Sequence, residues 1–367
     1  MRHPEKPQAV LLNFTANTYH WGCYGTSMEL WQSLVELGYC IEMVNVQEIH
    51  MFDPTPQKLG DFDDPDFGTS FLKANLRIYH LLLSADVVVV NGEGTLHGNG
   101  KAAVNLLYLM YLAKVNFQKR VHLVNGSFFP ADNGAPNEVL DMLYGRVAQK
   151  LDLLVPRETD SKAVLDRLGV ANVLGFDCLP RFIHRHGALH SHVFQPTIVV
   201  AGGVNMTREQ AQKFGELLAP FQTSGTRLRF LTGAKAFVNT EDARIYEEMK
   251  RHCPALECVN ALSMADWLKT LQNAACLVSA RYHHTLAAAS LGLPCVVFPS
   301  NTSKTNASLA MLGLNTMQSL DQGAEEIQHL LNEALAQRLA PAESVKVEQV
   351  VALAQNNFLQ LEDQPQS

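Results

Sequence analysis

The sequence lacks the features that define several large classes of protein. Its seven cysteines include no C-x-x-C pair and are scattered along the chain at positions 23, 40, 178, 253, 258, 276 and 295. This pattern indicates neither a zinc site nor a disulfide framework, and it favours buried free thiols in a reducing compartment. The net charge of −7 contains no basic excess, so we expect no nucleic-acid partner.

Long apolar runs are also missing. The run at 9–12 is too short for the core of a signal peptide, and the stretch at 106–113 is far short of a membrane span. We therefore expect a cytoplasmic protein. The sequence leaves peripheral membrane association and homo-oligomer formation open.

What the sequence does contain is an alternation of short apolar runs with amphipathic stretches. Strands are predicted at 9–13, 41–46, 86–90, 121–125, 151–155, 173–175, 197–201, 228–231, 276–279 and 295–298. Helices are predicted at 27–37, 77–83, 102–114, 137–150, 160–168, 208–218, 241–250, 265–273, 285–291, 306–312, 324–337 and 343–359. This alternation predicts an α/β fold with doubly wound parallel sheets.

The length of 367 residues favours two domains. We predict an N-terminal Rossmann-like domain at 1–182, a linker at 183–196, a C-terminal Rossmann-like domain at 197–338, and a helix with a polar tail at 339–367. Two such domains facing each other across a cleft describe a GT-B-like architecture. Because ligands bind beyond the carboxyl ends of parallel strands, we expect the chemistry in the loops that follow the strands.

The most informative loop follows the strand at 276–279 and reads Ser279-Ala280-Arg281-Tyr282-His283-His284-Thr285. Arg281 can grip a carboxylate or phosphate in a bidentate fork, and the start of the next helix adds N–H groups and partial positive charge. Histidine is the residue type best suited to carry a proton near neutral pH, which makes His283 a candidate general acid or base. The alternative is a purely structural helix start.

A second arginine, Arg157, follows another predicted strand in the stretch Val155-Pro156-Arg157-Glu158-Thr159-Asp160-Ser161. We expect its guanidinium to face the site from the first domain. The alternative is a surface ion pair with Glu158 or Asp160, which would contribute little to stability.

Four blocks, in this order, resemble the polysaccharide pyruvyl transferase family over most of residues 10–315. Residues 17–27 occupy the place of the family's N-x-G-D loop, and 86–96 are similar to its D-x-[VIL]-x-x-G-G-G-x-L block, with Glu93 in place of one glycine. Residues 155–177 resemble its v-x-R-[DE]-x-x-S … L … G … D block. Residues 279–304 resemble its S-x-R-[LY]-H … G-x-P … K signature.

The resemblance implies transfer of the pyruvyl group of phosphoenolpyruvate to a sugar hydroxyl pair, giving a ketal on a free or lipid-linked glycan, with no metal or other cofactor. It implies that His283 and Arg281 are catalytic. Glu93 is a further catalytic candidate, because its carboxylate follows a predicted strand in a glycine-containing loop. The resemblance implies that Arg157, Arg281, Tyr282 and His283 bind the donor. From their positions in the loops after the strands, Lys304 is a further donor-binding candidate, and the acceptor-binding candidates are Asn17, His20, Gly22, Asn91, Glu93 and Asn125. For Glu93, a capping or hydrogen-bonding role is the alternative.

Two other functions fit the same architecture. A GT-B glycosyltransferase would bind a nucleotide sugar in the second domain, with Glu241 or Asp242 as the carboxylate for the ribose and Lys235 or Lys304 beside the phosphates. A non-catalytic glycan-binding protein is the third reading, and the presence of both Arg281 and His283 speaks against it.

A metal site is the least favoured reading. Four histidines, at 184, 186, 190 and 192, have the i, i+2 spacing of an extended metal-binding strand. No nearby cysteine or carboxylate completes a ligand set, so we expect no metal.

Overall fold

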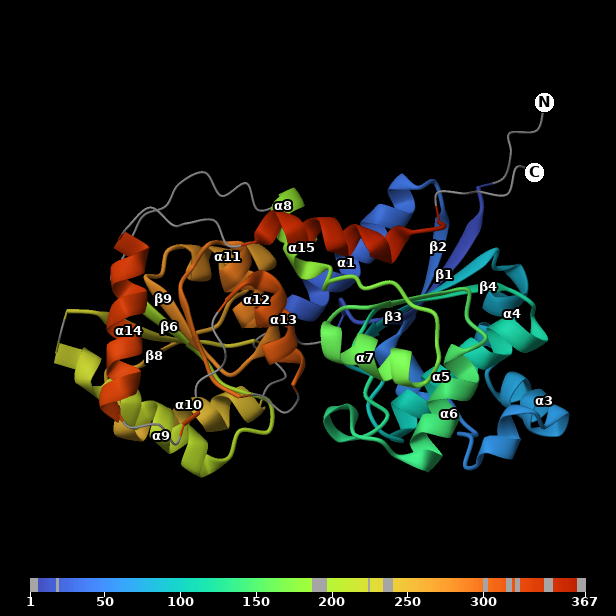
Figure 1. Cartoon of the computed structure of the whole chain (residues 1–367), viewed down its shortest axis with the longest axis horizontal. Coiled ribbons are helices and arrows are strands. Elements are labelled where there is room, and N and C mark those ends of the chain that lie inside the picture. The colour runs from blue at the N-terminus through green and yellow to red at the C-terminus, as the bar shows by residue number, and fades with distance from the viewer. Residues whose placement is uncertain are drawn as a thin grey trace. The chain divides into compact units, whose positions relative to one another are not determined.

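The structure is a computed structural model that describes residues 6–17, 20–186, 197–223, 225–233, 240–299, 303–314, 319–320, 324–339 and 346–361. The chain forms two compact units, whose elements are labelled in Figure 1. Unit 1 comprises Met1–Asn17, Ser27–Cys178 and Ala352–Ser367, and unit 2 comprises Thr18–Thr26 and Leu179–Val351. The divisions fall inside α1 (Trp21–Glu36) and α15 (Val347–Ala354), so neither unit is one continuous stretch of sequence.

Unit 1 is built on a five-stranded parallel sheet in the order β2-β1-β3-β4-β5. The strands are β1 (Gln8–Phe14), β2 (Cys40–Asn45), β3 (Val87–Glu93), β4 (Arg120–Gly126) and β5 (Leu153–Pro156). Its other helices are α2 (Val46–Met51), α3 (Pro65–Ala74), α4 (Leu76–Ser84), α5 (Lys101–Tyr111), α6 (Glu138–Ala148) and α7 (Thr159–Arg167). Four consecutive valines make β3 a strand buried on both faces, as expected at the centre of a parallel sheet.

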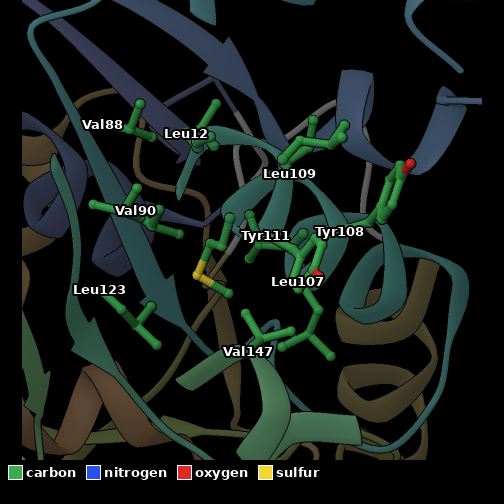
Figure 2. Close-up of a cluster of buried hydrophobic side chains, with 14 of the residues drawn as sticks. Leu12, Val88, Val90, Leu107, Tyr108, Leu109, Tyr111, Leu123 and Val147 are labelled. Atoms are coloured by element: carbon green, nitrogen blue, oxygen red, sulfur yellow. The ribbon is translucent and has the colours of Figure 1, made fainter. Parts of the chain in front are cut away.

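The core of unit 1 lies between this sheet and α5. Every residue of α5 from Ala102 to Tyr111 is buried, which is the pattern of a helix surrounded by other elements. Figure 2 shows Leu12, Val88 and Val90 of the sheet in one apolar cluster with the α5 side chains and Val147 of α6.

Unit 2 contains a second five-stranded parallel sheet, in the order β10-β9-β6-β7-β8. Its strands are β6 (Thr197–Ala201), β7 (Arg227–Leu231), β8 (Glu257–Val259), β9 (Cys276–Ser279) and β10 (Cys295–Val297). Its helices are α8 (Leu179–His186), α9 (Arg208–Leu218), α10 (Thr240–His252), α11 (Met264–Gln272), α12 (Tyr282–Ser290), α13 (Lys304–Leu312) and α14 (Ala324–Leu339). Two parallel, doubly wound sheets confirm the α/β class predicted from the alternation.

Several elements differ from the prediction. The helices α2, α3 and α8 and the strand β8 are additional; β8 has only three residues and two of them are exposed, so it gives no apolar run to detect. The predicted strand at 173–175 is irregular, although Val173 and Gly175 donate backbone hydrogen bonds to Leu154 and Pro156 at the end of unit 1's sheet.

The histidine-rich segment is partly helical. His184 and His186 are exposed residues of α8, where an i, i+2 spacing points side chains to different sides of a helix rather than to one face. The predicted ligands His190 and His192, and most of the predicted linker at 183–196, lie outside the described residues. Among the helices that the structure describes, none is long and apolar enough to cross a bilayer.

Each sheet has one position where the strand order reverses direction. In unit 1 it lies between β1 and β3, and in unit 2 between β6 and β9. Read from its other edge, the order in unit 2 is that of the dinucleotide-binding Rossmann fold. Because ligands of open parallel sheets bind in the crevice at such a reversal, the residues that end these four strands are the first candidates for a site.

Candidate functional site

In unit 1, the carboxylate of Glu93 lies at the reversal point between β1 and β3. Its Oε2 accepts a hydrogen bond from Thr15 Oγ1 at 2.6 Å and a longer one from Asn91 Nδ2 at 3.5 Å. The residue is 5% exposed. A carboxylate held by a hydroxyl and an amide in this way is suited to accept a proton from a substrate hydroxyl.

The backbone around Glu93 is strained. Asn13, Glu93 and Asn125 end three adjacent strands, and all have left-handed φ angles of 61°, 38° and 52°. Asn91 links the neighbouring strands. Its side-chain oxygen accepts a hydrogen bond from Asn125 Nδ2 at 2.8 Å, and its backbone oxygen accepts one from Asn13 Nδ2 at 2.6 Å. Non-glycine residues in this conformation persist only where their surroundings enforce it, and they cluster at functional sites.

Arg157, the predicted donor-binding residue of unit 1, is held in the interior. Its Nη1 lies 2.7 Å from Asp177 Oδ2, both side chains are at most 1% exposed, and its Nε donates to Ser127 Oγ at 2.9 Å. Glu158 instead caps α7 by accepting from Ser161 N at 2.7 Å. The charge of Arg157 is therefore neutralised by Asp177, and not by a surface pair with Glu158 or Asp160.

In unit 2, Arg281 joins three strand-end loops. Its Nε donates to Gly202 O after β6 at 2.8 Å, and its Nη2 lies 2.7 Å from Asp242 Oδ1 on α10. The other oxygen of Asp242 accepts from Gly233 N after β7 at 2.9 Å. Arg281 and Asp242 are 5% and 1% exposed, so this buried pair fixes the loops at the reversal point between β6 and β9.

The start of α1 packs within the same unit. Trp21 N donates to Gly233 O at 3.1 Å, and His20 Nδ1 lies 3.4 Å from Arg281 Nη1. Burial, with Arg281 and His283 nearby, lowers the pKa of His20 to about 3, so its ring is neutral at physiological pH. His20 and Gly22, predicted to bind the acceptor in the N-terminal domain, thus belong to unit 2.

The two histidines of the Arg281 loop, His283 and His284, differ in burial and in the residues they contact. His284 is buried, accepts from Trp267 Nε1 at 3.1 Å, and has its pKa lowered well below the usual value, chiefly by burial. It is a neutral structural residue. His283 is half-buried and packs directly on Gly22, where an added Cβ would lie 2.1 Å from the His283 Cβ.

The start of α12 is the other feature of this cluster. Arg281 is its N-cap residue and makes no side-chain capping hydrogen bond, so its guanidinium is committed elsewhere. The Nζ of Lys304, the first residue of α13, lies 5.5 Å from the centre of the Tyr282 ring. The first turn of a helix with a lysine beside it is a common arrangement for binding phosphate groups.

The predicted site residues thus fall into two groups. Arg281, Tyr282, His283, Lys304, His20 and Gly22 lie in unit 2, and Asn17, Asn91, Glu93, Asn125 and Arg157 lie in unit 1. Asn17 is exposed, and Lys235 lies outside the described residues. Sequence reasoning missed Thr15 and Ser27, which hydrogen-bond each other and hold Glu93 and Asn91, because isolated hydroxyl residues carry no local signal.

Comparison with known proteins identifies the architecture. Among similar solved structures are UDP-GlcNAc 2-epimerases from Neisseria meningitidis bound to UDP-GlcNAc (TM-score 0.59, 10% identity, 97% of this chain and 98% of that chain) and from Methanocaldococcus jannaschii in complex with UDP-GlcNAc and UDP (0.57, 12%, 94% and 98%). A glycotransferase of kitacinnamycin is also similar (TM-score 0.52, 12% identity, 96% and 95%). No protein-family model and no curated protein matches the chain. The predicted GT-B-like fold with two Rossmann-like domains is confirmed.

These comparisons correct the predicted family. The assignment to polysaccharide pyruvyl transferases, and with it phosphoenolpyruvate as the donor, is wrong, because the structural neighbours are UDP-GlcNAc 2-epimerases and glycosyltransferases and no family model matches. The physical reason lies in the arginines. Binding phosphoenolpyruvate, a small trianion, needs positively charged side chains that carboxylates do not already neutralise. Arg157 and Arg281 are instead each buried against an aspartate.

Proposed function

We propose that this protein is an enzyme that acts on a sugar activated by a nucleoside diphosphate, with uridine diphosphate as the activating group. The observation that supports it best is the likeness over nearly the whole chain to enzymes solved with UDP-GlcNAc or UDP bound. The Rossmann strand order of unit 2 adds to this support, because that order is a common frame for nucleotide sites.

The start of α12 is the part of unit 2 that suits a diphosphate. Its first-turn N–H groups and the helix dipole favour an anion, and Lys304 contributes a cation beside Tyr282. Arg281 supports the loops around this point and, being neutralised by Asp242, adds no net charge. We therefore assign the phosphate groups to the α12 start and Lys304.

The ribose needs a hydrogen-bond acceptor. Both oxygens of Asp242 already accept hydrogen bonds in the interior, from Arg281 and Gly233. Glu241, the neighbouring residue at the start of α10, is half-buried, and its Oε1 accepts from Asn205 N at 2.6 Å. Of the two carboxylates considered from the sequence, Glu241 is therefore the one we assign to the ribose.

Titration calorimetry with UDP, UMP and ADP tests the nucleotide assignment. We expect UDP to bind more tightly than UMP, since a second phosphate adds contacts at α12. Lys304→Ala should weaken UDP binding about tenfold, the effect of losing one charge-assisted contact of about 1.4 kcal/mol. Lys250→Ala, which changes an exposed lysine of α10, is the matched control and should leave affinity unchanged. Absence of UDP binding at millimolar concentration would refute the proposal.

Two reactions fit this proposal, epimerisation of the sugar and its transfer to an acceptor, and one assay with the wild-type protein can tell them apart. Incubation with UDP-GlcNAc in deuterated water should place deuterium on a sugar carbon if the enzyme epimerises, since the C–H bond at that carbon must break. Release of UDP that depends on an added acceptor would identify transfer instead. Glycan binding without either reaction would show a non-catalytic protein and overturn the proposal.

A further inference from the structure

Cys23 has a histidine side chain beside it. It is the third residue of α1, and its Sγ lies within 4.8 Å of a ring nitrogen of His283. Both side chains are half-buried. Gly22, the residue before Cys23, packs directly on His283, and a Cβ at position 22 would overlap the histidine side chain. This close contact keeps Cys23 near the imidazole.

The remaining cysteines have other surroundings. Cys178, Cys253 and Cys276 are buried, and burial raises the pKa of the Cys276 thiol to about 12. Cys295 donates its S–H to Leu293 O. Cys40 is exposed on β2 and serves as an internal reference for an accessible thiol.

A neighbouring imidazole can accept the proton of a cysteine thiol. His20 interacts with both His283 and Arg281 and has its pKa lowered to about 3, while Asp242 neutralises the charge of Arg281. A thiolate at Cys23 would gain from the protonated His283 and from the N-terminus of α1, both of which are positive. Cysteine–histidine pairs of this kind activate a thiol as a nucleophile.

We infer that Cys23 is a covalent-modification site, a thiol activated by His283 that reacts preferentially with soft electrophiles. With an alkyl iodide, His283 takes the thiol proton, the sulfur forms a bond to carbon, iodide leaves, and the imidazolium later returns its proton to solvent. This inference does not depend on the proposed nucleotide-sugar activity, since it concerns the reactivity of one side chain.

The test is limited alkylation of the folded full-length protein with substoichiometric iodoacetamide at pH 7, with each cysteine quantified by peptide mass spectrometry. We expect Cys23 to react at least about tenfold faster than the exposed Cys40, although it is less accessible. His283→Gln should bring the rate at Cys23 down to that of Cys40 or below. His50→Gln, on α2 in unit 1, should change neither rate.

A second measurement guards against misfolding of the His283→Gln protein. The alkylation rate at Cys23 in the wild-type protein should stay high at pH values where the rate at Cys40 has already fallen with its thiolate fraction. Equal pH profiles at Cys23 and Cys40, or a rate at Cys23 no greater than that at Cys40, would overturn the inference.

Discussion

Two buried arginines each connect a carboxylate to a loop at the end of a strand. Arg157 and Arg281 each lie against one aspartate, and each also hydrogen-bonds a neighbouring loop. Removing one partner of such a pair strands a buried charge, at a cost of about 3–5 kcal/mol. Both pairs are therefore best understood as cross-links that hold strand-end loops in position.

Glu93 is the residue whose chemistry can be tested most directly. Glu93→Gln keeps a similar shape and an oxygen for Thr15, but it removes the proton-accepting charge. We expect turnover of the nucleotide sugar to fall about 10²-fold or more, with little change in melting temperature. Glu42→Gln, at a side chain 60% exposed, is the control and should retain full activity. A Glu93→Gln protein of full activity would exclude a proton-transfer role.

His122 should make unit 1 sensitive to acid. The residue is 1% exposed on β4, and burial lowers its pKa from 6.5 to about 4. The unfolded chain therefore binds the proton first, so stability present above pH 6.5 is lost as pH falls toward 4. One such group contributes a slope of about 1.4 kcal/mol per pH unit. The free energy of unfolding, measured with denaturant between pH 4 and 7, should depend less steeply on pH in His122→Gln than in the wild type. In His50→Gln it should keep the wild-type slope. Equal slopes for all three proteins would contradict the assignment.

At the scale of elements, the contact between the first turn of α1 and the start of α12 organises unit 2. Trp21 bonds the loop after β7, and Gly22 lets the backbone of α1 meet His283 with no side chain between them. An element that begins far from unit 2 in sequence thus completes its strand-end cluster.

Gly22→Ala tests this contact. The new Cβ would lie 2.1 Å from the His283 Cβ, so either helix start must move. We expect a loss of about 1–3 kcal/mol, the usual range for overpacking, and weaker UDP binding. Gly60→Ala is the matched control, because nothing lies within 4 Å of its added Cβ. Calorimetric melting and UDP titration measure both effects, and unchanged values for Gly22→Ala would show that the helix starts are free to separate.

At the scale of the whole molecule, the chain returns to its first unit at the end. Ala352–Ser367 belongs to unit 1, and Tyr39 Oη donates to Leu361 O at 3.0 Å. The buried Asn357 accepts from Asn125 N at 2.7 Å and donates to Phe176 O at 3.0 Å. Asn357 therefore holds the strained end of β4.

Asn357→Ala should loosen unit 1 selectively. It leaves Asn125 N and Phe176 O without these partners, and each unsatisfied buried group costs about 1–3 kcal/mol. Hydrogen exchange should speed up at the amides of β3 and β4 and stay unchanged at those of β6 and β9. Asn356→Ala, which loses one half-buried bond to Leu174 O, should have a smaller effect. Equal acceleration in both sheets would argue against a clamp confined to unit 1.

The sequence by itself determined the α/β class, most of the strands, and the loops that carry Glu93, Arg281 and His283, because burial on both faces leaves short β-branched runs that local periodicity reveals. The tertiary structure decided what those residues do. Asp177 and Asp242 neutralise the arginines, the first turns of α1 belong to unit 2, and Asn13, Glu93 and Asn125 take left-handed backbones. Each of these depends on partners far apart in the chain, and no local pattern of residue types encodes such pairings.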